Sequence, residues 1–245
     1  MRLPWKIVRR LPDHHYVPRI YGRSAGKMRD IRHDERFMRA ADPVVKGEPR
    51  RSLLYYDRLH TLYQAFENAC RLSDVGPHMA EIGVFRGGGS AFLASLAVSF
   101  ERPGATLVAL DTFEGHAGAD LPTGREAVHV PGTFGDRTSY DDVRDYLSAY
   151  PFVNVVQGRV QDRTEAIGRN DYGLVHLDVD LYQPMRFGLD WFIQRMASGG
   201  TIVVDDHGFT TCPGVAQAVD EALSVATRPV AKFALLTGQC VLVVV

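Results

Sequence analysis

Apolar residues recur at helical spacing in one long stretch near the start of the chain. Residues 51–71 carry this pattern, which predicts a helix. The apolar positions are Leu54, Leu59, Leu62, Tyr63, Phe66 and Ala69. Residues 1–50 show no sustained period and are broken into short pieces by prolines. They are expected to form an irregular or short-helical arm ahead of a domain that spans residues 51–245.

From residue 78 onwards, short apolar segments alternate with longer segments of helical pattern. Strands are expected at residues 78–82, 106–110, 153–156, 174–177 and 201–204. Helices are expected at residues 90–100, 140–149, 161–167, 185–196 and 214–226. Apolar strands separated by helices are typical of a parallel sheet with both faces covered.

The last two apolar segments are separated by only three residues. Residues 232–236 and 240–245 flank Thr237, Gly238 and Gln239, and a connection this short permits only a hairpin. The pattern therefore predicts an α/β, doubly wound and mostly parallel seven-stranded sheet whose last strand is antiparallel.

Composition and charge restrict the class of protein further. The chain has 245 residues, of which 45% are hydrophobic and 23% are charged, as in an ordinary globular protein. It lacks the roughly 20-residue apolar run of a membrane span. The basic start is not followed by the apolar segment of a secretory signal. Three scattered cysteines indicate neither a disulfide framework nor a cysteine-based metal site, so a cytoplasmic location is expected.

The net charge of −1 conceals an asymmetry between the arm and the body. Residues 1–51 hold 14 Lys and Arg against 6 Asp and Glu, a balance of +8, whereas the remainder holds 14 against 23, a balance of −9. A basic arm can contact nucleic acid, a membrane surface or an anionic ligand. Because dense basic runs are missing, we expect the arm to pack on its own body or on a second copy in a homo-oligomer, with no nucleic-acid partner.

A glycine-rich turn follows the first predicted strand. The sequence Glu81-Ile-Gly83-Val-Phe85-Arg-Gly87-Gly-Gly89-Ser90 leads directly into a helix, and glycines there let the backbone approach a ligand. The spacing differs from the dinucleotide fingerprint, and a tight turn without a ligand would also explain it. The second strand ends in Asp111, where an acid can accept both ribose hydroxyls of a nucleoside. The two features together favour a nucleoside-containing cofactor.

Aspartates follow the fourth and fifth predicted strands. Asp178 and Asp180 come after one strand, and Asp205 and Asp206 after the next. Carboxyl ends of neighbouring parallel strands meet at one edge, where these acids would repel each other unless a cation bound them. An oxygen-rich set of ligands suits Mg²⁺, with Mn²⁺ as the alternative.

Two other enzyme classes use similar acid motifs. A haloacid-dehalogenase phosphatase would place its nucleophile on the first strand and a lysine before the paired acids, and neither condition holds here. A glycosyltransferase that binds a nucleotide sugar through Asp-x-Asp and a metal remains an alternative, although it would leave the glycine turn and Asp111 unexplained.

The ordered set of motifs resembles class I S-adenosylmethionine-dependent methyltransferases, and more closely the macrocin O-methyltransferase family of antibiotic pathways. The matching segments are residues 81–89, 111–115, 132–134, 178–182 and 199–206. The resemblance implies a cytoplasmic enzyme that binds S-adenosylmethionine and Mg²⁺ or Mn²⁺. Its cofactor-binding residues would be Glu81, Gly83, Phe85, Gly87, Ser90, Asp111, Thr112, Phe113, Val160, Gln161, Asp162 and Asp178.

Within that set, the resemblance places Gly83 and Gly87 beside the methionine part of the cofactor and residues 160–162 around the adenine. It assigns the metal to Asp178, Asp205 and Asp206. The sequence departs from the family at Gly89 and at His207, and the catalytic lysine of the distantly similar catechol methyltransferases would fall at Leu181.

The implied reaction is metal-dependent transfer of a methyl group to a hydroxyl of a sugar or another small hydroxylated metabolite. The attacking hydroxyl must lose its proton, and Asp178, Asp180 and His207 are the candidate bases. A metal-dependent enzyme of the same fold with other, hydroxylase-like chemistry and a degenerate binding module are the remaining alternatives.

Overall fold

The computed structural model describes residues 30–73, 76–121 and 128–245. Its elements, in chain order, are the short helix η2 (Ile31–His33), α1 (Glu35–Lys46), α2 (Tyr56–Leu72), β1 (His78–Ile82), α3 (Gly88–Ser99), β2 (Thr106–Asp111), η3 (Gly118–Asp120), η4 (Gly135–Arg137), α4 (Tyr140–Leu147), β3 (Val153–Gln157), η5 (Val160–Asp162), β4 (Tyr172–Leu177), α5 (Tyr182–Ile193), β5 (Met196–Val204), α6 (Pro213–Val225), β6 (Val230–Ala234) and β7 (Cys240–Val244).

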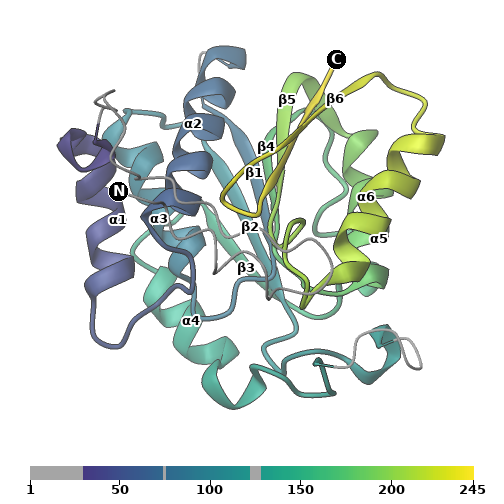
Figure 1. The fold of residues 1–245 in the computed structure, drawn as a ribbon. Coiled ribbons are helices and arrows are strands. Elements are labelled where there is room, and N and C mark those ends of the chain that lie inside the picture. Colours follow the sequence, from purple (N-terminus) through teal and green to yellow (C-terminus); the bar gives the residue numbers. More distant parts are fainter. Residues whose placement is uncertain (1–29, 74–75, 122–127) are drawn as a thin grey trace, which may run out of the picture. The chain divides into compact units, whose positions relative to one another are not determined.

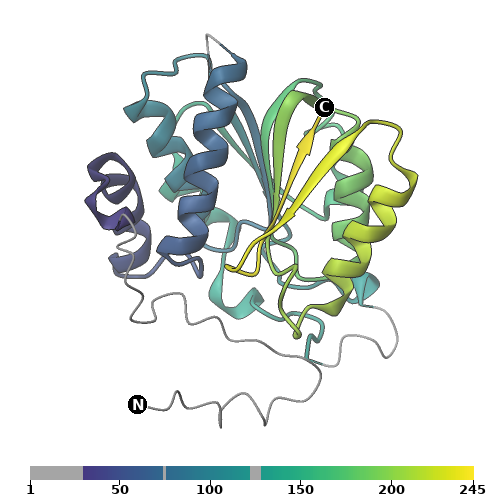
Figure 2. The same cartoon turned by 45° about the horizontal axis from the view of Figure 1, so that its top comes forward.

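These elements form one seven-stranded sheet between two helical layers. The strand order is β3-β2-β1-β4-β5-β7-β6. Strands β1 to β5 pair in parallel, and β7 runs antiparallel to both β5 and β6. Helices α2 to α4 cover one face, with α1 packed against α2 and α3, and α5 and α6 cover the other face (Figures 1 and 2). The predicted fold class, including the antiparallel last strand, is confirmed.

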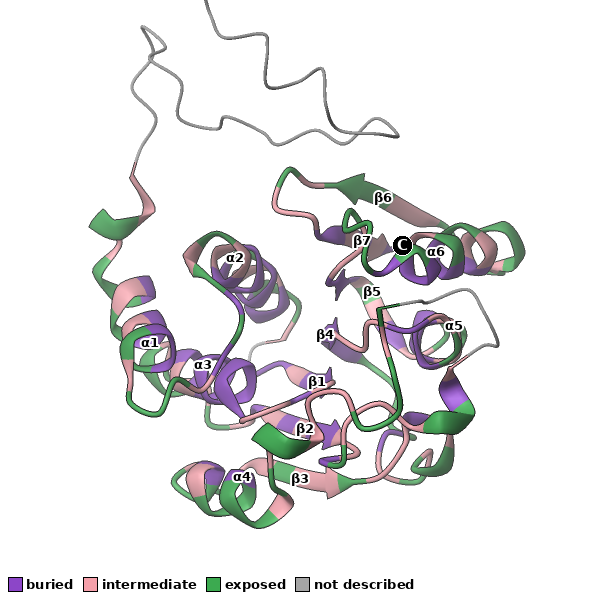
Figure 3. Ribbon diagram, turned by 60° about the horizontal axis from the view of Figure 1, so that its bottom comes forward, coloured by how far each residue is buried: buried purple, intermediate pink, exposed green. Residues whose placement is uncertain are grey.

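Burial follows the position of each strand in the sheet. Every residue of β4 is buried, whereas the edge strands β3 and β6 consist of intermediate and exposed residues (Figure 3). The central strands therefore supply the apolar surface that both helical layers cover. None of the helices in the described ranges is long and apolar enough to cross a bilayer.

The second part of the predicted irregular or short-helical arm contains a regular helix, α1. Asp34 caps α1 by accepting a hydrogen bond from the amide of Phe37 at 3.0 Å, and Pro43 lies inside the helix. Phe37 and Val44 are buried in the same core as α2 and α3. Residues 31–50 thus belong to the compact unit that extends to residue 245. Residues 1–29 of the predicted arm lie outside the described residues.

The helix predicted at residues 161–167 is wrong. Only the short helix η5 forms, and turns follow it up to residue 167. Seven residues close too few intrahelical hydrogen bonds to repay helix nucleation. Tertiary contacts decide the local structure instead: Arg163 donates its Nε to the carbonyl of Gln157 at 2.8 Å, and Trp191 donates to the carbonyl of Ile167 at 3.0 Å.

Close approach of the β1 and β4 ends demands glycine at position 83. A Cβ on Gly83 would lie 1.8 Å from the carbonyl oxygen of Asp178, and its φ of +88° is left-handed. Gly132 is a matched control, because it has a φ of +81° but nothing within 4 Å of a built Cβ.

We predict that Gly132→Ala costs roughly 1–2 kcal/mol of unfolding free energy, from the left-handed backbone alone. Gly83→Ala adds a clash with backbone atoms and should cost at least about 3 kcal/mol. Urea denaturation of both variants measures the difference. Equal losses in the two variants would contradict the close approach of these strand ends.

Candidate active site

A cavity of about 320 Å³ lies at the carboxyl edge of the parallel strands. Its walls come from the turn after β1, the loops after β2, β3 and β4, and the segment that precedes α2. In a parallel sheet this edge gathers the segments that leave neighbouring strands, which is where open α/β sheets bind ligands.

The glycine turn is held by a buried polar network under this cavity. Glu81 accepts hydrogen bonds from the hydroxyl of Ser90 and from Nδ1 of His176, the latter at 2.9 Å. A Cβ on Gly89 would lie 1.9 Å from the Glu81 carboxylate, so the space taken by this network excludes a side chain there. Glu81, Gly83 and Phe85 line the cavity, whereas Ser90 supports the turn from behind.

Asp111 lines the cavity as the sequence predicts, and its carboxylate also holds the glycine turn. Oδ2 accepts the amides of Val84 and Phe85 at 2.6 and 2.8 Å, and Oδ1 accepts the amide of Phe113 at 2.8 Å. A carboxylate has about four acceptor positions. A ribose would therefore share this carboxylate with the backbone that Asp111 itself positions.

The far end of the cavity contains a polar cluster around Gln161. Its Nε2 donates to Asp120 at 3.0 Å, and Asp120 also binds Arg159 through two nitrogens. The Oε1 atom of Gln161 is buried without a partner among the described residues. This free acceptor, next to the apolar side chain of Val160, fits an adenine that offers an exocyclic amino group.

Four carboxylates meet beside the middle of the cavity. The Arg58 guanidinium on α2 lies 3.1 Å from Asp205 and 3.6 Å from Asp206. Asp178 and Asp205 bring oxygens within 4.8 Å of each other and of a ring nitrogen of His176. Asp180 and Asp206 bring theirs within the same distance of Cys212. These oxygen donors, with one guanidinium against four acids, fit a hard divalent cation.

The proximity of these acids shifts their pKa values in opposite directions. Burial and the charges of Asp205, Asp206 and Asp180 raise the pKa of Asp178 well above its ordinary value. Burial, followed by the hydrogen bond with Asp180 and the charge of Asp205, raises the pKa of Asp206 to about 9. Burial also opposes ionisation of Asp180, but hydrogen bonds from His116 and Asp206 outweigh it and lower the pKa.

Several residues that leave the strands adopt a left-handed backbone. Phe85 after β1, Phe113 after β2, Asp180 after β4 and Asp206 after β5 have φ between +53° and +58°. This conformation is uncommon for residues other than glycine, with aspartate and asparagine tolerated best. At each of these four positions the left-handed residue turns the chain sharply as it leaves the strand at the cavity edge.

Not all predicted site residues face the cavity. Eight of the cofactor residues line it, together with Asp180 and Asp206. Six predicted residues do not contribute to its lining: Gly87, Ser90, Phe113, Asp162, Asp205 and His207. Asp205 is fully buried behind Arg58, and Asp162 is exposed and paired with Arg159. Burial and then the charge of Lys232 on β6 lower the pKa of His207, a base candidate that does not line the cavity.

Sequence reasoning missed several cavity residues. Arg58 lies in an amphipathic helix whose pattern does not distinguish it from other exposed cations. His116 and His129 lie in the long loop after β2, and their rings pack at 4.8 Å between centroids. Two histidines in a loop that follows Asp111, the predicted ribose-binding residue, were the available signal.

Comparisons with known proteins agree with this geometry. A family model described as macrocin-O-methyltransferase (TylF) matches residues 28–230. The 8-demethyl-8-(2,3-dimethoxy-alpha-L-rhamnosyl)-tetracenomycin-C 4'-O-methyltransferase of Streptomyces olivaceus is 25% identical over 184 residues, which are 70% of each chain.

Two solved structures share the fold. The O-methyltransferase NovP has a TM-score of 0.67 at 20% identity, with 87% of this chain and 98% of that chain covered. TomG from Streptomyces achromogenes, solved in complex with SAM, has a TM-score of 0.51 at 17% identity, with 86% and 90% covered.

The raised pKa of Asp206 predicts a pH dependence of stability in the metal-free protein. Its carboxyl stays protonated in the folded state but ionises in the unfolded state above pH about 4. The stabilisation from this group is therefore complete below pH 4 and is lost as the pH rises towards 9. Asp180, with its lowered pKa, titrates below this window.

We expect Asp206→Asn to unfold at a higher temperature than the wild type at pH 8, with a gain of at least about 1 kcal/mol that shrinks towards pH 5. Calorimetry in a chelating buffer measures this gain. Glu165→Gln, at an exposed carboxylate, is the control and should change little. A gain for Asp206→Asn that does not vary with pH would contradict the assignment.

Proposed function

We propose that this chain, which belongs to the macrocin O-methyltransferase family, methylates a sugar hydroxyl with the help of a divalent cation. The family match confirms the resemblance drawn from the sequence, and the protein is an S-adenosylmethionine-dependent O-methyltransferase. With that activity established, the glycosyltransferase and hydroxylase-like alternatives are set aside. The observation that supports the cation is the proximity of four carboxylates at the ends of β4 and β5, two of which lie against Arg58.

The cofactor would extend along the cavity from the glycine turn to Gln161. Gly83 lines the cavity at the end of β1, and Asp111 holds the turn from the wall. The unpartnered Oε1 of Gln161 would accept the adenine amino group. S-adenosylmethionine supplies an electrophilic methyl group when bound; the residues named here would bind and orient it.

Asp178, Asp205 and Asp206 would hold the cation. When bound, a divalent cation lowers the pKa of a hydroxyl and orients it for attack. The Arg58 guanidinium lies 3.1 Å from the carboxylate of Asp205 and 3.6 Å from the carboxyl group of Asp206. The same guanidinium would keep these two carboxylates together before and after the cation binds.

Asp180 would accept the proton of the attacking hydroxyl. It lines the cavity, and its lowered pKa keeps it ionised at neutral pH. His116 donates Nε2 to the Asp180 carboxylate at 3.0 Å and thereby fixes its orientation. Asp178 is a weaker candidate because its raised pKa favours the protonated form.

A sugar is the acceptor class that the relatives favour. The Streptomyces olivaceus enzyme is named for methylation at the 4' position of a rhamnosyl tetracenomycin. The cavity of this chain combines acids with arginine side chains, including Arg51, Arg58 and Arg159, and such polar walls suit a ligand with many hydroxyls. A role in the biosynthesis of a glycosylated natural product follows from this assignment.

The test separates cofactor binding from catalysis. Asp178→Asn removes one negative ligand and keeps the side-chain size. We expect S-adenosylmethionine to bind within about threefold of the wild-type affinity, because Gly83, Asp111 and Gln161 are unchanged. Turnover with a deoxysugar glycoside should fall by at least about 100-fold.

Excess EDTA should reproduce this loss in the wild type, and added Mg²⁺ should reverse it. Asp190→Asn, at an exposed carboxylate on α5, is the matched control and should retain activity. Isothermal titration measures binding, and transfer of a labelled methyl group measures turnover. Full activity in excess EDTA would overturn the role of the cation.

A further inference from the structure

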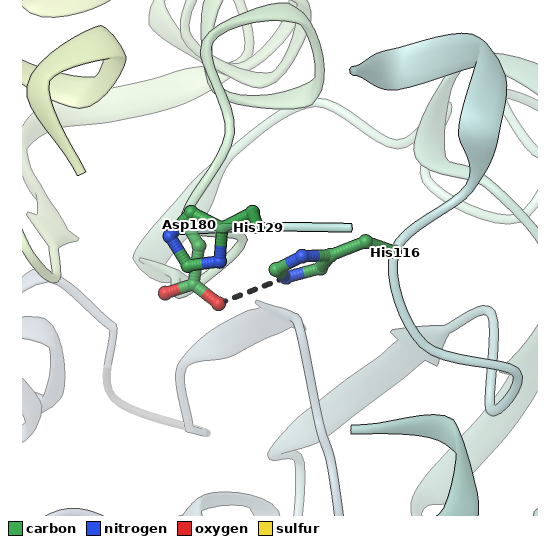
Figure 4. Close-up of side chains that lie close together, drawn as sticks. All are labelled: His116, His129 and Asp180. Carbon is green, nitrogen blue, oxygen red and sulfur yellow. Dashed lines mark hydrogen bonds and ion pairs between the residues drawn. The ribbon is translucent and has the colours of Figure 1, made fainter. Parts of the chain in front are cut away.

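Two histidines and one aspartate that line the cavity converge beside the four carboxylates, with Asp180 belonging to both groups. One ligand atom from each of His116, His129 and Asp180 lies within 4.8 Å of the other two. In Figure 4 both imidazoles and the carboxylate point toward one another. The two histidines come from the loop after β2, and Asp180 comes from the turn after β4.

The hydrogen bonds of His129 determine which of its nitrogens is available. Its Nε2 lies 3.1 Å from the carbonyl oxygen of Thr211, which can only accept, so Nε2 carries the proton. Nδ1 therefore keeps its lone pair, and it is buried without a partner among the described residues. A histidine whose second nitrogen donates to a backbone carbonyl is oriented in the manner of metal-binding histidines.

His116 and Asp180 supply the other two donors. Their Nε2 and Oδ2 atoms are 3.0 Å apart, close to the roughly 3.3 Å between neighbouring ligands of a tetrahedral Zn²⁺ ion. In the metal-free protein a proton lies between them, and a metal ion would displace it. The imidazoles and the carboxylate are also well shielded, with 10% and 16% of the side-chain surface exposed in His116 and Asp180.

We propose that His116, His129 and Asp180 form a second metal site, selective for a borderline transition-metal ion such as Zn²⁺. Two imidazoles and one carboxylate favour such ions over Mg²⁺, which prefers oxygen ligands. The site differs in ligands from the all-carboxylate set of Asp178, Asp205 and Asp206. A bound ion would tie the loop after β2 to the end of β4.

Occupation of this site would also withdraw Asp180 from proton transfer. The inference does not depend on the proposed methyl transfer, because it concerns metal binding alone. The two sites can be distinguished by their ligands and by their preference for hard or borderline ions.

The experiment uses the untagged full-length protein, stripped of metal and held in excess Mg²⁺ so that the carboxylate set is saturated. Equilibrium dialysis against Zn²⁺ should give one tightly bound ion per chain. His116→Ala and His129→Ala should each weaken binding by at least about tenfold, since even the loss of a partner behind a metal ligand has effects of about 10- to 100-fold.

Two control variants define the specificity of the result. His33→Ala, at an exposed histidine of η2, should bind Zn²⁺ normally. Asp178→Asn should also bind Zn²⁺ normally, because it alters only the carboxylate set. If Zn²⁺ binding is lost in Asp178→Asn but kept in both histidine variants, the ion occupies the carboxylate set and the proposal is overturned.

A measurement on the wild type protects the test against variants that fail to fold. Co²⁺ is a spectroscopic substitute for Zn²⁺, and in excess Mg²⁺ its complex should show visible d–d absorption. Proton NMR of that complex should contain paramagnetically shifted N–H signals from two imidazoles. A Co²⁺ complex without imidazole signals, or no binding at all in excess Mg²⁺, would sink the proposal.

Discussion

Electrostatic repulsion among buried carboxylates is the constraint on which the rest of this site depends. Four aspartates leave two neighbouring strands at one edge, and a single guanidinium from Arg58 lies against two of them. The acids respond by dividing their protons: Asp180 stays ionised, whereas Asp178 and Asp206 favour the protonated form. A bound cation would supply the positive charge that these acids need to ionise together. The repulsion among the acids lowers the stability of the metal-free fold, and cation binding can offset that loss.

The parts of the site that follow directly from strand ends could be predicted from the sequence. A short apolar strand fixes where its last residue emerges, and parallel pairing brings the exits of β4 and β5 to one edge. Gly83 and Asp178 illustrate this, because the residue after each strand faces the same cavity. The alternation of strands and helices similarly identified the sheet and its antiparallel end, since both depend on local pattern.

Features that depend on tertiary contacts could not be predicted in this way. Arg58 and Asp205 are 147 positions apart, and neither residue carries a local signal of the other. Asp111 was expected to serve a ribose, yet its oxygens also anchor the glycine turn, a role that only the packed structure reveals. The bounds of helix α1 within the predicted arm could not be given because Pro43 suggests a break, although burial of Phe37 stabilises the helix around it.

The left-handed backbone at Asp180 and Asp206 affects how sequence variation in relatives should be interpreted. Aspartate, asparagine and glycine are the residues that tolerate this conformation best, so backbone geometry alone would restrict these positions to a small set. An aspartate retained there during evolution is therefore weak evidence for catalysis. Replacement of aspartate by asparagine is the informative substitution, because it keeps the turn and removes only the charge. Relatives that carry asparagine at these positions would identify lineages that keep the fold but have lost the charge that the proposed reaction needs.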